Sequence, residues 1–266
     1  MRLLIITPTL GKSPYLDKTV DSVRAVEKMS GWEIKHILVA PTGGLDKLRA
    51  QYPELTLLGE TGTTLYQAIN QALIASHSDF DYWTYINDDD YLLQGFAEVL
   101  HRASFFNGPC VIYGKVVIIN SVGDFTNKVT RWTLPRLMRG ALGGGRSPLN
   151  QQGALWSKSV IERVGYFDPT LKYAADYDYF FRCANMRVCY QYVANNVAAY
   201  RVHAAQLGQD GGPFRHELDL VRERYKIATI YRFFCNTLFP LLNLDIYFWR
   251  VFRGRPFGTA LFADAK

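Results

Sequence analysis

The first half of the chain alternates short apolar runs with amphipathic stretches. Apolar runs cover Leu3 to Thr7, Ile34 to Val39 and Tyr82 to Ile86, and each has the length of a buried strand. Around them, apolar residues recur three and four positions apart, as on one face of a helix; one such face is formed by Phe96, Val99, Leu100 and Ala103. This alternation predicts an α/β fold with a Rossmann-like, mostly parallel central sheet and helices on both faces.

Three polar residues are predicted to begin helices. Ser13 stands before Pro14, and proline is favoured at the first helical position. Thr64 can cap the helix that follows it. Ser159 and Glu162 have the spacing of a capping box.

Periodicity is lost between residues 120 and 150, after an apolar run from Val111 to Ile119. The aperiodic segment contains three consecutive glycines at 143–145. It predicts either a mobile loop over the functional site or an ordinary surface insertion.

Composition limits the class of protein. The 266 residues, 48% of them hydrophobic, can form the core of one large domain. The four cysteines form no CxxC pair, which argues against zinc and a disulfide scaffold and fits a reducing cytoplasm. No apolar run reaches the roughly 18 residues of a membrane span, so we expect a cytoplasmic protein that is soluble or bound peripherally to the inner face of the cytoplasmic membrane.

The C-terminal segment is basic and aromatic. Of the net charge of +6, residues 215–266 hold +4, from nine basic and five acidic residues. Bulky apolar side chains lie between these arginines, as at Phe233 and Phe234, and this suits an anionic membrane surface. The alternative is a helical cap packed on the main domain. Without a basic stripe or a recognition motif, we expect no nucleic-acid partner.

Three consecutive carboxylates, Asp88, Asp89 and Asp90, directly follow the third apolar run. The end of a strand is where an open α/β sheet binds its ligands. Carboxylates this close repel one another, and a divalent cation bound through oxygen is the usual way to hold them near a core. The sequence therefore predicts a metal site, with a solvated acidic turn as the alternative.

Asp176 begins a second candidate site. It precedes a predicted helix and is placed to be its N-cap. An N-cap position favours the ionised carboxylate. The residue is therefore a structural cap, a general base for a hydroxyl nucleophile, or both.

Four segments, in order and spacing, make residues 1–205 resemble glycosyltransferase family 2, the inverting enzymes with the GT-A fold. These segments are Thr7-Pro8-Thr9, Tyr66 to Asn70, Asn87 to Asp90, and Gly165 to Asp168 running on to Ala174 to Asp178. The resemblance implies transfer of a sugar from a nucleotide-sugar donor to a glycan or lipid-linked acceptor.

The resemblance also implies roles for particular residues. Mn²⁺ or Mg²⁺ would be held by Asp88 and Asp90 and would stabilise the leaving diphosphate, with Asp89 turned toward the donor sugar or ribose. His203 falls where the family often places a residue near the metal. The implied donor-binding residues are Thr7, Pro8, Thr9, Asn70, Asp88, Asp89 and Asp90.

On the acceptor side, the resemblance makes Asp176 the base. Asp178 would support it, and Gln152 matches the second residue of a His-Gln pair that lines the acceptor site in many relatives. Gln151 departs from that pair. The chain also lacks the family's acidic contact to the base after the second strand, and it has Gly62 and Gln67 where a common pattern has aspartates. The nucleotide and the sugar are thus left open.

Other classes of function share some of these features. A nucleotidyltransferase would want a glycine-rich basic loop after the first strand, and Thr7 to Lys12 is a poor version of one. A phosphotransferase with an aspartyl nucleophile has only the carboxylates in its favour. A degenerate carbohydrate-binding or scaffold protein would keep the fold without the acidic residues.

These observations predict a GT-A catalytic domain over residues 1–212. Its nucleotide-sugar-binding half would span 1–105 and its acceptor-binding half 106–212. A basic, aromatic, helical tail would follow over 213–266.

Overall fold

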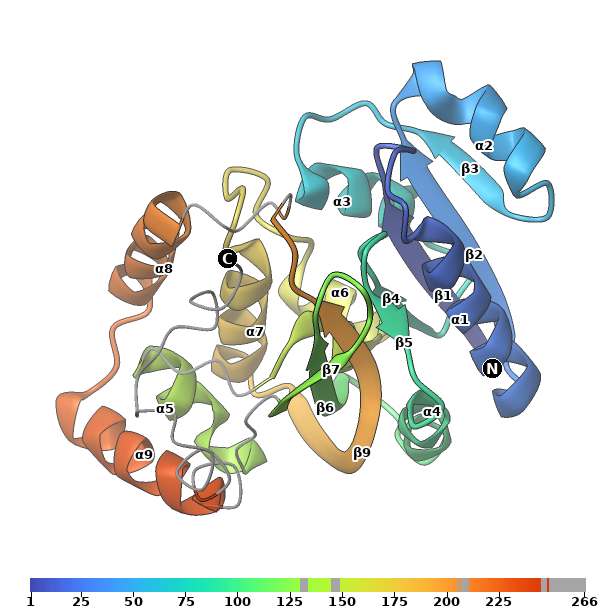
Figure 1. The fold of residues 1–266 in the computed structure, drawn as a ribbon. Coiled ribbons are helices and arrows are strands. Elements are labelled where there is room, and N and C mark those ends of the chain that lie inside the picture. Colours follow the sequence, from blue (N-terminus) through green and yellow to red (C-terminus); the bar gives the residue numbers. More distant parts are fainter. Residues whose placement is uncertain (130–133, 145–148, 205, 207–210, 245–247, 249–266) are drawn as a thin grey trace.

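The computed structural model describes residues 1–129, 134–144, 149–204, 206, 211–244 and 248, and it has a curled central sheet surrounded by helices (Figure 1). The strands are β1 (Arg2–Pro8), β2 (Glu33–Ala40), β3 (Thr56–Gly59), β4 (Tyr82–Tyr85), β5 (Tyr91–Leu92), β6 (Cys110–Ile119), β7 (Phe125–Val129), β8 (Ala154–Ser157) and β9 (Cys189–Arg201). The helices are α1 (Leu16–Ser30), α2 (Leu45–Gln51), α3 (Leu65–Ala75), α4 (Phe96–Ala103), α5 (Met138–Gly143), α6 (Lys158–Val164), α7 (Ala175–Asn185), α8 (Gly211–Arg224) and α9 (Thr229–Leu242). Short 3₁₀ turns are η1 (Thr42–Gly44), η2 (Pro135–Leu137) and η3 (Gln151–Gly153).

The first half of the sheet is parallel, in the order β3-β2-β1-β4. Its strands are apolar on both faces because helices cover both, as the unbroken apolar runs predict. Ile6 of β1 is in register with Ile37 of β2 and Tyr85 of β4. The carboxyl ends of these strands therefore meet at one edge, where the acidic triplet follows β4.

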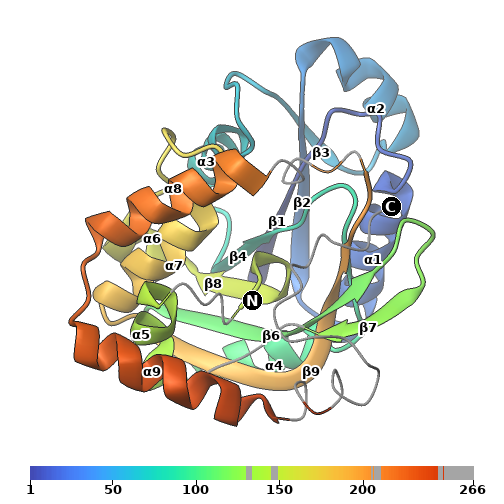
Figure 2. The same cartoon turned by 60° about the vertical axis from the view of Figure 1, so that its left-hand side comes forward.

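The second half of the sheet is mixed. β8 is antiparallel to both β4 and β6, β6 is parallel to β9, and β5 is antiparallel to β9. The α/β prediction is confirmed, but parallel pairing is confined mainly to the first half. β9 bends strongly along its 13 residues, and its register against β6 shifts twice (Figures 1 and 2).

Two of the predicted helix starts differ from the structure. Thr64 caps α3 as expected, since its hydroxyl accepts the Gln67 N–H. The N-cap of α1 is Tyr15, because the Ser13 hydroxyl instead donates to the carbonyl of Asp88. The N-cap of α6 is Ser157, so Ser159 does not begin a capping box.

The aperiodic segment 120–150 is more ordered than predicted. It contains β7, which pairs with β6, and α5, which lies against α7 and α9. Short elements of this length carry too few repeats to show a periodicity. Residues 130–133 and 145–148, including Gly145, lie outside the described residues.

The C-terminal helices pack on the domain. Val221 of α8 is fully buried in the main core. Cys235 of α9 lies against Gly140 of α5 so closely that a side chain at Gly140 would collide with its sulfur. Among the described residues, no helix is both long and apolar enough to cross a membrane. The end of the predicted tail, 245–247 and 249–266, lies outside the described residues.

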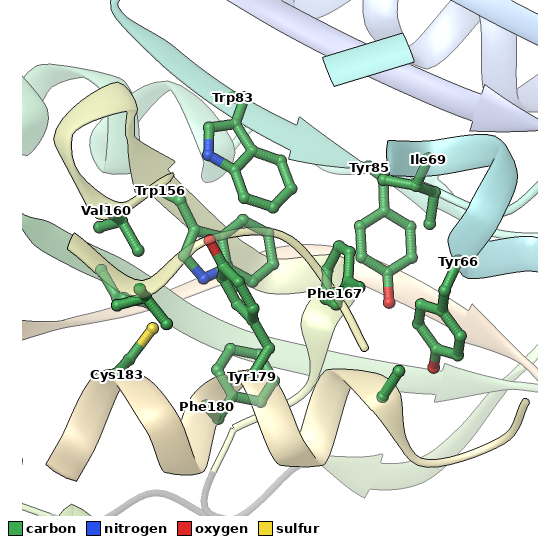
Figure 3. Close-up of a cluster of buried hydrophobic side chains, with 14 of the residues drawn as sticks. Tyr66, Ile69, Trp83, Tyr85, Trp156, Val160, Phe167, Tyr179, Phe180 and Cys183 are labelled. Atoms are coloured by element: carbon green, nitrogen blue, oxygen red, sulfur yellow. The ribbon is translucent and has the colours of Figure 1, made fainter. Parts of the chain in front are cut away.

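Aromatic side chains form the centre of the core, between the sheet and α7 (Figure 3). Trp83 of β4 and Trp156 of β8 stack with ring centroids 4.6 Å apart. Phe167 meets Trp83 edge-on, and Phe180 of α7 stacks on Trp156. This cluster joins the two halves of the sheet to the helix that carries Asp176.

Replacing Trp156 by alanine should remove that junction. Trp156 is fully buried, so we expect the free energy of unfolding to fall by about 3–5 kcal/mol. Urea denaturation measures the change. Phe105→Ala is the control, because Phe105 is 69% exposed and should change stability by less than about 0.5 kcal/mol.

Candidate active site

Hydroxyl groups from the residue after β1 and from α1 hold the acidic loop in place. Thr9 donates to Asp88 Oδ2 over 2.5 Å, and the Thr19 hydroxyl donates to the carbonyl of Asp90 over 2.6 Å. Burial raises the pKa of Asp88 to about 6, against the opposing effect of the Thr9 hydrogen bond. Thr9 is thus part of the site.

Asp90 is fully buried, and N–H donors surround its carboxylate. Oδ1 accepts the backbone N–H of Arg201 at 2.8 Å, and Oδ2 accepts the amides of Gln152 at 2.8 Å and Asn87 at 3.3 Å. Burial, followed by the charge of Asp89, raises the pKa of Asp90 well above its usual value. Asp90 therefore joins the loop to β9 and η3, and its oxygens do not point freely toward a ligand.

Gln152 consequently has a different position from the one expected. Its amide donates a hydrogen bond to Asp90, so Gln152 supports the acidic loop rather than lining the acceptor side. Gln151 is also buried, and neither atom of its amide has a hydrogen-bond partner among the described residues.

Asp89 pairs with His203. Asp89 Oδ2 lies 2.9 Å from His203 Nε2, and both side chains are about 85% buried. The other oxygen, Oδ1, is buried without a described hydrogen-bond partner. A buried carboxylate oxygen without a donor is costly, so this atom is a candidate for contact with a ligand or an ordered water.

Arg201 also supports the acidic loop, and no sequence pattern predicts this role. Its Nε donates to the carbonyl of Asp89, and its guanidinium lies 4.1 Å from the ring centroid of Tyr15. Arg201 is also the strand residue whose backbone binds Asp90. One residue of β9 thus fixes two of the three aspartates.

Asp176 lies in the first turn of α7. The N-cap is Ala174, so the N-cap prediction for Asp176 is wrong; its carboxylate accepts the adjacent N–H of Tyr177 at 2.7 Å. Burial raises the pKa of Asp176 to about 6, and hydrogen bonds from Tyr177 and Tyr66 oppose that rise. Figure 3 shows Tyr66 and Tyr85 beside the N-terminal end of α7. The result is a carboxylate poised near neutral pH.

The acidic loop and Asp176 both lie near the same buried tyrosines. Burial raises the pKa of Tyr200 first, and then the negative charges of Asp90, Asp89 and Asp176 raise it further. The pKa of Tyr85 is likewise raised, first by burial and further by the negative charges of Asp176 and Asp90. The acidic loop and Asp176 thus act on the same tyrosines, while a single site formed by both stays a prediction.

Glu217 of α8 holds the loop that leads into α7, a role that sequence reasoning missed. Its carboxylate accepts the backbone N–H groups of Lys172, Tyr173 and Ala174 at 2.7–2.9 Å. α8 (Gly211–Arg224) spans the predicted boundary at residue 212, and its Glu217 lies in the predicted tail, so the first part of that tail packs on the preceding domain.

Asp178 does not lie on the acceptor side. It is fully buried, and its oxygens bind Arg182 at 2.7 Å, Arg224 at 3.2 Å and the hydroxyl of Tyr225 at 2.9 Å. Its carboxylate therefore joins α7 to the end of α8 rather than supporting Asp176.

Other predicted donor contacts are also structural. Thr7 is buried and its hydroxyl pairs with His36 at 2.9 Å, beneath the site. Asn70 exchanges two hydrogen bonds with the backbone of Phe167 and so fixes the loop ahead of α7. Pro8 is the buried last residue of β1.

Comparisons with known proteins were made on sequence and on structure. No protein-family model matches the chain, and no curated protein matches it in sequence. Among solved structures, S. aureus TarS 1-349 matches with a TM-score of 0.57 and 13% identity over 98% of this chain and 76% of that one. TarS 1-349 in complex with UDP (TM-score 0.57, 14% identity, 94% and 73% covered) and with UDP-GlcNAc (0.56, 13%, 94% and 74%) match similarly.

The chain therefore has the fold of TarS, whose structure has been solved with UDP and with UDP-GlcNAc. The likeness shows the fold alone, and the chemistry has to be argued from the residues.

Asp176 and Asp178 are two residues apart on α7. Replacing each by asparagine should change the free energy of unfolding in opposite directions. Because the folded pKa of Asp176 is raised, the fold binds its proton more tightly than the unfolded chain, and its ionised form opposes folding at neutral pH. Asp176→Asn should therefore raise the free energy of unfolding near pH 7 by about 1–3 kcal/mol. The gain should vanish as the pH falls from about 6 toward about 4.

Asp178→Asn should instead lower the free energy of unfolding by about 3 kcal/mol, because it breaks buried ion pairs. Chemical denaturation of both variants over this pH range measures the contrast. A loss of stability in Asp176→Asn would make Asp176 a structural residue.

Proposed function

We propose that this chain is an inverting glycosyltransferase that moves a sugar from a nucleotide-sugar donor to a hydroxyl of a glycan or lipid-linked acceptor, with a divalent metal. The observation that carries the proposal is the Asp89–His203 pair, in which the second oxygen of Asp89 is buried without a hydrogen-bond partner among the described residues. Asp89 and Asp176 also lie near the same tyrosine, Tyr200. The fold shared with a UDP-GlcNAc-bound glycosyltransferase supports a uridine nucleotide as the first donor to test.

The residues fit a divalent ion bound jointly with the donor. Among the described residues, no three His, Cys, Asp or Glu side chains converge to form a metal site by themselves. Mg²⁺ is commonly held by only one or two carboxylates, with substrate phosphates and water as the remaining ligands. Asp89 and His203 would supply the protein's share of Mn²⁺ or Mg²⁺, and Asp88 lies next to them.

This assignment revises the expected metal set of Asp88, Asp90 and His203. Asp90 is enclosed by N–H donors, whereas Asp89 keeps a buried oxygen without a partner among the described residues. When bound, the ion would stabilise the negative charge that develops on the leaving diphosphate.

Asp176 is proposed as the general base. An acceptor hydroxyl must lose its proton as its oxygen attacks the anomeric carbon, and a carboxylate with a pKa of about 6 is largely ionised at neutral pH yet basic enough to assist. Gln151 is buried, and its amide has no hydrogen-bond partner among the described residues. It precedes Gln152, whose amide supports Asp90. Gln151 is therefore proposed to contact the acceptor in place of Gln152.

Nucleotide binding is the first test. Calorimetry with UDP, GDP, dTDP and CDP, with and without Mn²⁺, should show one nucleotide that binds only with the metal. Asp89→Asn should weaken that binding about 10- to 100-fold, as loss of a metal-positioning group does. Asp46→Asn is the control, since Asp46 is fully exposed on α2. Equal binding with and without Mn²⁺ would contradict the metal assignment.

Transfer should depend on ionised Asp176. Asp176→Asn should lower kcat about 10²- to 10⁴-fold while metal-dependent nucleotide binding persists. In the wild-type protein, kcat/KM should fall about tenfold per pH unit below about pH 6, because burial has raised this pKa and the protonated base is inactive. A rate independent of pH between about 5 and 7 would contradict this role.

A further inference from the structure

A cavity of about 1040 Å³ lies away from the acidic loop. Its walls come from η2 and α5, from the end of α7, from the start of β9 and from α9. β9 begins in this cavity at Cys189 and ends at Arg201, which supports the acidic loop. The cavity is therefore separate from the candidate active site.

Three arginines line the cavity: Arg136 and Arg139 beside α9, and Arg187 in the turn between α7 and β9. None of the described lining residues is acidic, and none of the three arginines forms an ion pair with another described residue. Guanidinium groups that share a concave surface and have no acidic partner among the described residues attract an anion, and they suit phosphate oxygens.

The rest of the lining is apolar, which a site for phosphate alone would not need. Leu137 and Met138 form one wall, and Tyr231 and Leu238 of α9 form another. The combination fits an anionic group attached to an apolar body.

The apolar surface continues from the cavity onto the outside of α9. Successive residues of α9 are turned by about 100° around the helix axis, which gives the order of its positions around the helix. The buried Cys235 is followed in this order by Tyr231 and Leu238, which lie in the cavity wall. The following positions are Phe234, Leu241 and Ile230, which are 55%, 56% and 80% exposed. Exposed bulky side chains thus border the cavity.

We propose that this surface docks on a membrane, with the phosphate head group of an anionic phospholipid in the cavity. Phe234, Leu241 and Ile230 would enter the boundary between head groups and acyl chains. The proposal extends the sequence-based prediction of membrane attachment, because all three arginines lie before residue 213 and thus outside the predicted tail. It does not depend on the proposed transferase chemistry.

Arg187 offers a substitution that should not harm the fold. Its φ is +54°, a left-handed conformation that favours glycine. Arg187→Gly should therefore remove the charge while relieving the backbone. Arg139→Gln and Phe234→Ser test the second cationic group and the apolar border. Arg49→Gln is the matched control, because Arg49 is an exposed arginine paired with Asp46 on α2.

Vesicle flotation of the full chain should show binding to phosphatidylcholine mixed with phosphatidylglycerol and little binding to phosphatidylcholine alone. Each arginine variant should weaken binding about fivefold, the effect of losing one cationic group at an anionic surface. Phe234→Ser should also weaken it, and Arg49→Gln should not. The affinity for UDP, measured by calorimetry on the same preparations, should be the same in all variants. Vesicle binding therefore tests the membrane proposal, and UDP binding tests the transferase proposal separately.

Three outcomes would overturn the proposal: equal binding to neutral and anionic vesicles, unchanged binding in Arg187→Gly and Phe234→Ser, or no vesicle binding at all. Soluble glycerol phosphate distinguishes the source of the phosphate. Binding of glycerol phosphate that Arg187→Gly abolishes, without vesicle binding, would assign the cavity to a soluble phosphate instead.

Discussion

The site is organised by the burial of one carboxylate, that of Asp90. A charged group removed from water is tolerated only when donors replace the water, and here the donors come from three separate parts of the chain. The backbone of β9, the amide of Gln152 and the amide of Asn87 all converge on it. Satisfying Asp90 therefore fixes the second half of the sheet against the first, and it leaves Asp89 turned toward His203.

A second set of carboxylates organises the other side of the site. Glu217 accepts three backbone N–H groups of the loop before α7, and Asp178 joins α7 to Arg224 of α8. Both contacts depend on α8, so this helix sets the position of Asp176 although it contributes nothing to the proposed chemistry. The ionised form of Asp176 opposes folding at neutral pH, because burial raises its pKa. Such a cost in stability is common where a protein retains a reactive group.

The pairing of the strands and the different roles of the aspartates explain which predictions succeeded. The pattern of apolar runs located the strands of the first half, because a strand covered on both faces is apolar throughout. The mixed second half was missed, since β5 has two residues, β8 has four, and their direction depends on partners far along the chain. Likewise, Asp178 and Asn70 belong to the segments that carry the resemblance, yet their side chains hold helices and loops together.

By itself, the sequence determined the α/β class, the position of the acidic loop after a buried strand, and the candidate base at the start of a helix. These are local properties, set by side-chain periodicity and by neighbours within a few residues. Only the tertiary structure decided which aspartate is enclosed by donors and which keeps a buried oxygen without a described partner, because the deciding donors are 111 residues from Asp90 in one case and 62 in another. The cavity beside α9 was decided in the same way, since its arginines come from segments that share no motif and meet only when the chain folds.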